Sequence, residues 1–192
     1  MDPIERAGIL RQEADVLLRK LHVYEIVSEY GTLTPTGSYF LDVMVYPDID
    51  FCISQLSIEQ LFSIGGKLAA SPLVYEIVFQ KSRDESLPGG LYLKPRIQYG
   101  NWERPWKIDF WSLAAEVIEQ KMAPMWRFKQ AMTEALRQQI IRYKVSILTP
   151  GGRTPMYSGY FVYRAFIDEG LTDHKQVTQY LIANGIQMDS VP

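Results

Sequence analysis

Two carboxylates on a short apolar segment point most directly to chemistry. Residues 48–53 read "DIDFCI", so Asp48 and Asp50 alternate with apolar residues. This alternation is typical of a β-strand with one buried and one polar face, and it places both acids on the polar face. Carboxylates this close repel each other unless a cation lies between them. The cation is either a lysine with water or a metal ion, and this segment alone leaves both open.

A third acid and several cations follow on later segments that alternate in the same way. In "WKIDFW", Lys107 and Asp109 share one face, and in "LYLKPRIQY" Lys94 and Arg96 share one face. If the polar faces of these strands coincide, one surface of the sheet combines the carboxylates with the cations. Carboxylate oxygens suit hard divalent cations, and Lys, Arg and backbone N–H groups suit phosphates. Each acid pattern alone also fits a solvated sheet face, so the functional interpretation depends on their combination.

The elements that must position these residues predict an α+β fold. Helices are expected over 3–20, 22–29 and 57–70, and strands over 32–36, 48–53, 73–80, 91–99 and 106–111. Ser57 with Gln60 is a capping-box signature for a helix start, and Pro88-Gly89-Gly90 marks a turn between strands. We therefore predict a mixed β-sheet with helices on one face.

The chain changes character after residue 112. Helices are expected over 113–122, 126–147 and 158–169, and a last one from 172 or 173 to 184. The segment "PGGRTP" between them contains glycines and an arginine but lacks the Lys-Ser/Thr of a P-loop, so it is predicted to be an ordinary loop. The predicted organisation is a catalytic domain over 1–112 followed by a helical region over 113–192.

Composition restricts the class of protein. The chain of 192 residues is 47% hydrophobic and 22% charged, which is typical of a globular domain. Its net charge of −2 predicts no bulk binding of DNA or RNA, although a small polyanionic ligand needs only a few placed cations. The single Cys52 suits a reducing compartment, and no apolar stretch is long enough to predict a membrane span. The cytoplasm is therefore the expected location.

The order and spacing of these residues resemble a known signature. Gly37-Ser38, a short spacer, Asp48-Ile49-Asp50 and the later Asp109 look like the motif of the nucleotidyltransferase superfamily. That superfamily includes polymerase β-like enzymes and the nucleotidyltransferases that inactivate antibiotics. Its motif is a Gly-Ser or Gly-Gly turn, an acid–apolar–acid strand and an acid on a following strand. The resemblance covers roughly residues 30–112 and leaves the subgroup open, because the Arg that some small members carry after the turn is absent.

The resemblance implies a role for each residue of the motif. Gly37 and Ser38 would hold the β- and γ-phosphates of a nucleoside triphosphate. Asp48 and Asp50 would bind one or two Mg²⁺ or Mn²⁺ ions. Asp109 would share a metal, activate the acceptor hydroxyl, or do both. A metal ion would then be the cation between the first two acids.

The resulting hypothesis is a Mg²⁺-dependent nucleotidyltransferase. It would transfer NMP from an NTP to a hydroxyl of a small molecule or a protein. The candidates for the cations that accompany the triphosphate are Lys94, Arg96 and Lys107, and the only argument for them is the strand face on which each is expected to lie. One alternative is a catalytically inactive nucleotide- or metal-binding module of the same fold, and another is a helical interaction protein with incidental acids. The preferred NTP, the acceptor and the oligomeric state stay open.

Overall fold

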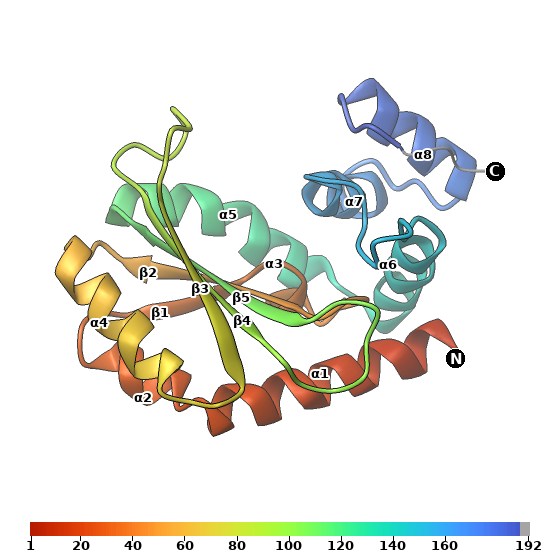
Figure 1. The fold of residues 1–192 in the computed structure, drawn as a ribbon. Coiled ribbons are helices and arrows are strands. Elements are labelled where there is room, and N and C mark those ends of the chain that lie inside the picture. Colours follow the sequence, from red (N-terminus) through yellow and green to blue (C-terminus); the bar gives the residue numbers. More distant parts are fainter. Residues whose placement is uncertain (189–192) are drawn as a thin grey trace.

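A five-stranded mixed sheet forms the centre of the molecule (Figure 1). The computed structural model describes residues 1–188. The sheet has the order β1-β2-β5-β4-β3, in which β2 and β5 are parallel and every other pair is antiparallel. The strands are β1 (Leu33–Thr36), β2 (Asp48–Ser54), β3 (Val74–Lys81), β4 (Leu91–Ile97) and β5 (Trp106–Leu113). The predicted α+β class with a mixed sheet is confirmed.

Three helices cover the apolar face of the sheet. They are α1 (Pro3–Lys20), α2 (Val23–Ser28) and α4 (Ile58–Ala69), and they lie below the sheet in Figure 1. Phe51 of β2 and Phe110 of β5 stack on this face with ring centroids 5.7 Å apart, and Leu10 and Leu17 of α1 belong to the same core. The predicted capping box opens α4, because Ser57 and Gln60 bind each other's backbone N–H groups. Alternation along the strands has therefore left the acids on the opposite face.

The helix after the sheet differs from its predicted bounds. A break was expected near Pro124, but α5 runs through it from Ala115 to Ala131. Proline removes one helical hydrogen bond, yet Met122, Met125 and Phe128 on either side are buried and hold the helix together. The break lies instead at Thr133, whose side chain caps α6 (Glu134–Ser146).

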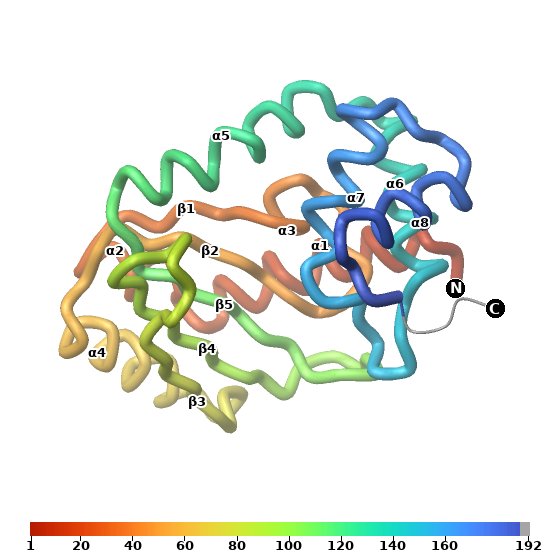
Figure 2. The backbone as a smooth tube through the Cα atoms, turned by 90° about the horizontal axis from the view of Figure 1, so that it is seen from above, coloured from red at the N-terminus to blue at the C-terminus, as the bar shows by residue number. Residues whose placement is uncertain are grey.

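The C-terminal helices gather at one end of the sheet. Here α6 lies beside the N-terminal part of α1, α7 (Ser158–Ile167) packs on α6, and α8 (His174–Ala183) packs on α7 (Figures 1 and 2). Their core includes Val43 and Val45, which precede β2, so the half that contains the sheet and the helical half share apolar contacts. Residues 189–192 of the predicted helical region lie outside the described part of the chain. Within residues 1–188, every helix is too short or too polar to cross a lipid bilayer.

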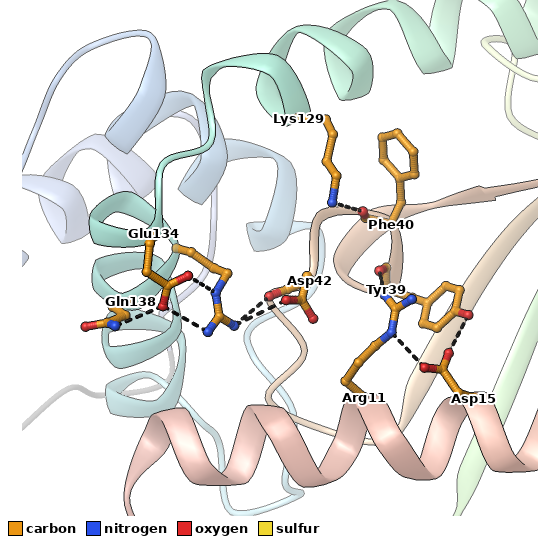
Figure 3. Close-up of polar contacts among 9 residues, drawn as sticks. Arg11, Asp15, Tyr39, Phe40, Asp42, Lys129, Glu134 and Gln138 are labelled. Carbon is orange, nitrogen blue, oxygen red and sulfur yellow. Dashed lines mark hydrogen bonds and ion pairs between the residues drawn. The ribbon is translucent and has the colours of Figure 1, made fainter.

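The Gly-Ser turn opens a short helix, α3 (Gly37–Leu41), which neighbouring elements hold by its carbonyl groups. Arg11 donates to the carbonyl of Tyr39 at 2.8 Å and Lys129 to that of Phe40 at 3.0 Å (Figure 3). Arg137 donates to the carbonyl of Asp42 at 3.2 Å. Cations at a helix C-terminus stabilise the exposed carbonyls. Contacts from α1, α5 and α6 therefore fix α3 in place.

This arrangement predicts the effect of removing one of the clamping cations. Arg137→Gln removes a charge-assisted hydrogen bond to Asp42 and ion pairs to Asp42 and Glu134, and should lower the free energy of unfolding by about 1–3 kcal/mol. Arg142→Gln, on the same helix, removes only an exposed ion pair to Asp2 at 3.6 Å and should cost less than about 1 kcal/mol. Urea denaturation of both variants makes the comparison. Equal losses would show that the carbonyl contact contributes nothing special.

Candidate active site

Three carboxylates meet on the polar face of the sheet. In the parallel pairing of β2 with β5, Asp48 lies beside Lys107 and Asp50 beside Asp109. One carboxylate oxygen from each of Asp48, Asp50 and Asp109 lies within 4.8 Å of the others. The strand alternation predicted that each acid faces this side, and the pairing of β2 with β5 brings them together. The chemistry of this donor set fits a hard divalent cation, which prefers oxygen ligands.

Lys107 is the cation that lies among the acids in the structure. Its Nζ is 2.8 Å from Asp48 Oδ1 and also forms an ion pair with Asp109 Oδ2. The hydroxyl of Tyr92 on β4 donates to Asp109 Oδ1 at 2.7 Å. Both oxygens of Asp109 therefore have a partner that fixes the orientation of the carboxylate. Burial alone would lower the pKa of Lys107, but the attraction of Asp48, Asp109 and Asp50 outweighs it and raises the pKa.

One lysine does not offset the charge of the acids. Burial raises the pKa of the Asp48 carboxyl, even though Lys107 opposes the shift. The pKa of Asp50 rises well above its usual value, through burial and through repulsion from Asp48 and Asp109. Both shifts mean that the cluster would be more favourable with additional positive charge. A second cation at this position would supply that charge.

The Gly-Ser turn approaches the acids closely. Gly37 has a φ of 61°, and a Cβ atom on it would lie 2.5 Å from Asp50 Oδ2. Only glycine fits there, both for its backbone conformation and for its contact with the carboxylate. The next residue, Ser38, lies in the first turn of α3, and its hydroxyl contacts Lys144 of the helical half. The structure therefore places the first acid strand and the turn beside each other.

Ser38 has a cationic neighbour that the sequence interpretation missed. Lys144 Nζ donates to Ser38 Oγ at 2.7 Å and to the carbonyl of Val43 at 2.7 Å, and the hydroxyl of Tyr163 is 2.9 Å from Ser38 Oγ. Lys144 is 1% exposed, and burial lowers its pKa to about 7. The available signal was a lysine on the apolar side of the helix expected over 126–147, one turn after Ile140.

The three cations that the strand alternation suggested for the triphosphate do not contact Ser38 in the structure. Lys107 lies among the acids, as described above. Arg96 forms an ion pair with Glu76 on the neighbouring strand at 2.8 Å. Lys94 Nζ lies 5.9 Å from the centre of the Tyr92 ring. Within residues 1–188, the cation hydrogen-bonded to Ser38 is Lys144, so a triphosphate role for Lys94, Arg96 or Lys107 stays a prediction.

Fold and acid positions together define the class. An acid–apolar–acid strand lies parallel to a strand with a third acid, and a Gly-Ser turn on a short helix faces them. This is the arrangement of the polymerase β-like nucleotidyltransferase fold, which the sequence resemblance predicted.

Comparison with solved structures agrees at the level of the fold through one structure with a TM-score of 0.50. A cytoplasmic RNA terminal U-transferase superposes with a TM-score of 0.50 at 15% identity, over 78% of this chain and 44% of that one. Cid1 in complex with its short product ApU superposes with a TM-score of 0.47 at 13% identity, over 71% of this chain and 40% of that one. The GLD-2/RNP-8 complex superposes with a TM-score of 0.49 at 15% identity, over 99% of this chain and 65% of that one. The chain thus spans less than half the length of the first two. No protein-family model and no curated protein matches the sequence.

The acid cluster predicts a response to divalent metal. Mg²⁺ or Mn²⁺ should stabilise the folded protein by about 2.7 kcal/mol at a concentration 100 times its Kd, because only the folded state brings the acids together. The thermal midpoint with and without metal measures this. An Asp48→Asn/Asp50→Asn variant should show no metal-dependent rise. A rise of equal size in that variant would contradict binding at these acids.

The raised pKa values predict how pH acts on this response. Above the pKa of an unfolded Asp, about 3.9, the folded state of metal-free protein retains extra protons on Asp48 and Asp50. The contribution of Asp48 and Asp50 to the free energy of unfolding therefore falls as the pH rises from the unfolded-state pKa to their raised folded-state pKa values. Metal binding requires deprotonated carboxylates, so the metal-induced rise in the thermal midpoint should be larger at pH 8 than at pH 5. A pH-independent rise would contradict this linkage.

Proposed function

We propose that the protein transfers a nucleoside monophosphate from an NTP to the 3′-hydroxyl of an RNA. The observation that carries the proposal is the convergence of three carboxylates within 4.8 Å beside a Gly-Ser turn. RNA replaces the small molecule or protein expected from the sequence, because the solved structure with the TM-score of 0.50 is an RNA terminal U-transferase. We keep residues 1–112 as the catalytic domain and the cytoplasm as the compartment within this proposal.

Asp48, Asp50 and Asp109 would hold the metal. When bound, Mg²⁺ or Mn²⁺ stabilises the attacking and leaving oxygens of an in-line displacement at the α-phosphorus. Asp109 accepts the proton of the attacking hydroxyl, and Tyr92 keeps this carboxylate oriented through its hydrogen bond. The acceptor oxygen forms a bond to the α-phosphorus while the bond to pyrophosphate breaks, so the nucleotide is added and pyrophosphate leaves.

The triphosphate binds along α3. The glycine at position 37 allows the backbone to approach the phosphates, and the Ser38 hydroxyl donates a hydrogen bond to them. Lys144 already contacts Ser38 and supplies the positive charge. Its pKa of about 7 means that it is partly neutral near neutral pH without ligand, and a neighbouring polyphosphate would raise that pKa and keep it protonated. This residue joins the triphosphate site to the helical half.

A catalytically inactive module of the same fold is the second candidate. It would keep the metal and nucleotide contacts of the acids and of Ser38, and it would lack turnover. The triad offers both the metal ligands and a proton acceptor, which favours the enzyme. The helical interaction protein gives no reason for three acids that converge on one face of the sheet, because solvated acids need no such convergence. Measuring transfer separates the first two candidates.

Two variants test the division of roles. Asp109→Asn should lower the rate of transfer by about 10²–10⁴-fold, because a positioned proton acceptor is lost, while NTP binding persists. Asp48→Asn/Asp50→Asn should lose metal-dependent NTP binding itself. Asp84→Asn, an exposed acid in the loop between β3 and β4, is the matched control and should leave both unchanged.

The assays are pyrophosphate release with each NTP, extension of a single-stranded RNA, and titration calorimetry with a non-hydrolysable NTP. An RNA that ends in a 3′-deoxynucleotide should not be extended. Release of pyrophosphate without extension of any RNA would contradict the acceptor class. Equal, wild-type NTP affinity in both triad variants would contradict the assigned roles.

A further inference from the structure

A small cationic cavity adjoins the acid cluster. Its volume is about 190 Å³, and it is lined by Arg96, Arg104, Pro105, Lys107, Gly151 and Arg153. These residues come from β4, from β5 with the loop before it, and from the "PGGRTP" loop of the helical half. The cavity thus lies between the two halves of the chain, and four of its six lining residues are cationic. The sequence interpretation had treated the loop as ordinary.

Two of the three arginines of this cavity form no ion pair within residues 1–188, whereas Arg96 is paired with Glu76. Nε and Nη1 of Arg104 are buried without a hydrogen-bond partner, and its guanidinium lies 5.6 Å from the centre of the Tyr46 ring. Within residues 1–188, neither Arg104 nor Arg153 forms an ion pair with a carboxylate. A buried donor without an acceptor is unfavourable, so the site suits an anionic ligand that supplies the missing oxygens.

The loops that form the cavity are held firmly. Thr149 donates to the carbonyl of Arg153 from its backbone N–H at 2.8 Å and from its hydroxyl at 2.9 Å. Gly152 packs against Glu103, since a Cβ on this glycine would lie 3.0 Å from Glu103 Cβ. Arg6 binds Glu103 with two hydrogen bonds, of 3.0 and 2.8 Å. The backbone on which Arg104 and Arg153 lie is therefore held by contacts between the loops.

The cavity lies beside a different part of the acid cluster from the Gly-Ser turn. Lys107 lines the cavity and contacts Asp48 and Asp109, whereas Gly37 approaches Asp50. An in-line displacement places the attacking and leaving groups on opposite sides of the α-phosphorus. With the triphosphate along α3, an anion at this cavity belongs to the acceptor.

We propose that the cavity binds the phosphodiester next to the 3′-terminal hydroxyl of the acceptor RNA. This rests on the proposed function and adds the contact that recognises the acceptor. Guanidinium groups match two phosphate oxygens at once, and four cations line the cavity. A nucleoside or a protein hydroxyl has no phosphate to place there. The net charge of −2 fits such a local contact, in contrast to binding along a broad basic surface.

A paired change in protein and acceptor tests the contact. The acceptors are two short RNAs that differ only at the last internucleotide linkage, a normal phosphodiester or a neutral methylphosphonate. For the wild type, kcat/KM should fall by about tenfold or more with the neutral linkage, since a charge-assisted hydrogen bond is lost. In Arg104→Gln and Arg153→Gln, both RNAs should react at similar, reduced rates, and KM for NTP should be unchanged. Arg83→Gln, in the exposed loop between β3 and β4, should behave as wild type.

The outcomes separate this proposal from the proposed function. If the wild type extends both RNAs equally, the phosphodiester contact is wrong although the activity stands. If the neutral linkage slows the arginine variants as much as the wild type, the cavity is not the site. A rise in KM for NTP with unchanged acceptor kinetics would assign the cavity to the triphosphate and overturn the proposal. If the wild type extends no RNA, the proposed function fails, and fluorescence anisotropy with the same two RNAs still compares their binding to the cavity. Each arginine is tested alone, so that loss of folding in one variant leaves the other.

Discussion

Repulsion among three clustered, partly buried carboxylates is the constraint on which the rest of the structure depends. Asp48, Asp50 and Asp109 lie within reach of a single cation, and burial raises the pKa values of the first two. Such an arrangement persists only where the surroundings fix it. The parallel pairing of β2 with β5 sets the spacing of the acids, and the stacked Phe51 and Phe110 on the opposite face anchor the two strands. The apolar core beneath the sheet thus maintains an unfavourable cluster above it.

The hydrogen bonds to the carbonyl groups at the end of α3 explain why the helical half is needed at the site. α3 is too short to be stable by itself, since isolated helices need far more residues. Arg11 from α1, Lys129 from α5 and Arg137 from α6 each donate to one of the carbonyls at its end. Lys144 donates both to the carbonyl of Val43, just after α3, and to the Ser38 hydroxyl. The Gly-Ser turn therefore keeps its position through contacts that span both halves of the chain.

Local patterns predicted the parts of the site that depend on local geometry. The alternation around Asp48 and Asp109 predicted which side each acid faces, because a strand has a period of two wherever it lies in the sheet. Their proximity required the β2–β5 pairing, which no local pattern encodes. Lys144 escaped prediction for the same reason, since its partner Ser38 is 106 residues earlier in the chain. The helix bounds predicted around Pro124 were wrong, because packing of Phe128 and its neighbours outweighed the low helix propensity of proline.

Lys107 connects the acid cluster with the cationic cavity. Its ammonium group neutralises Asp48 and Asp109 in the structure, and the same side chain lines the cavity with Arg96. In the proposed mechanism, a divalent cation held by the three acids would supply positive charge that Lys107 supplies to Asp48 and Asp109 in the structure. The lysine then has less attraction to the carboxylates and more to an anion in the cavity. Under the proposed function, metal and acceptor phosphate would therefore favour each other's binding through one side chain, since the affinity of either depends on which charge Lys107 faces.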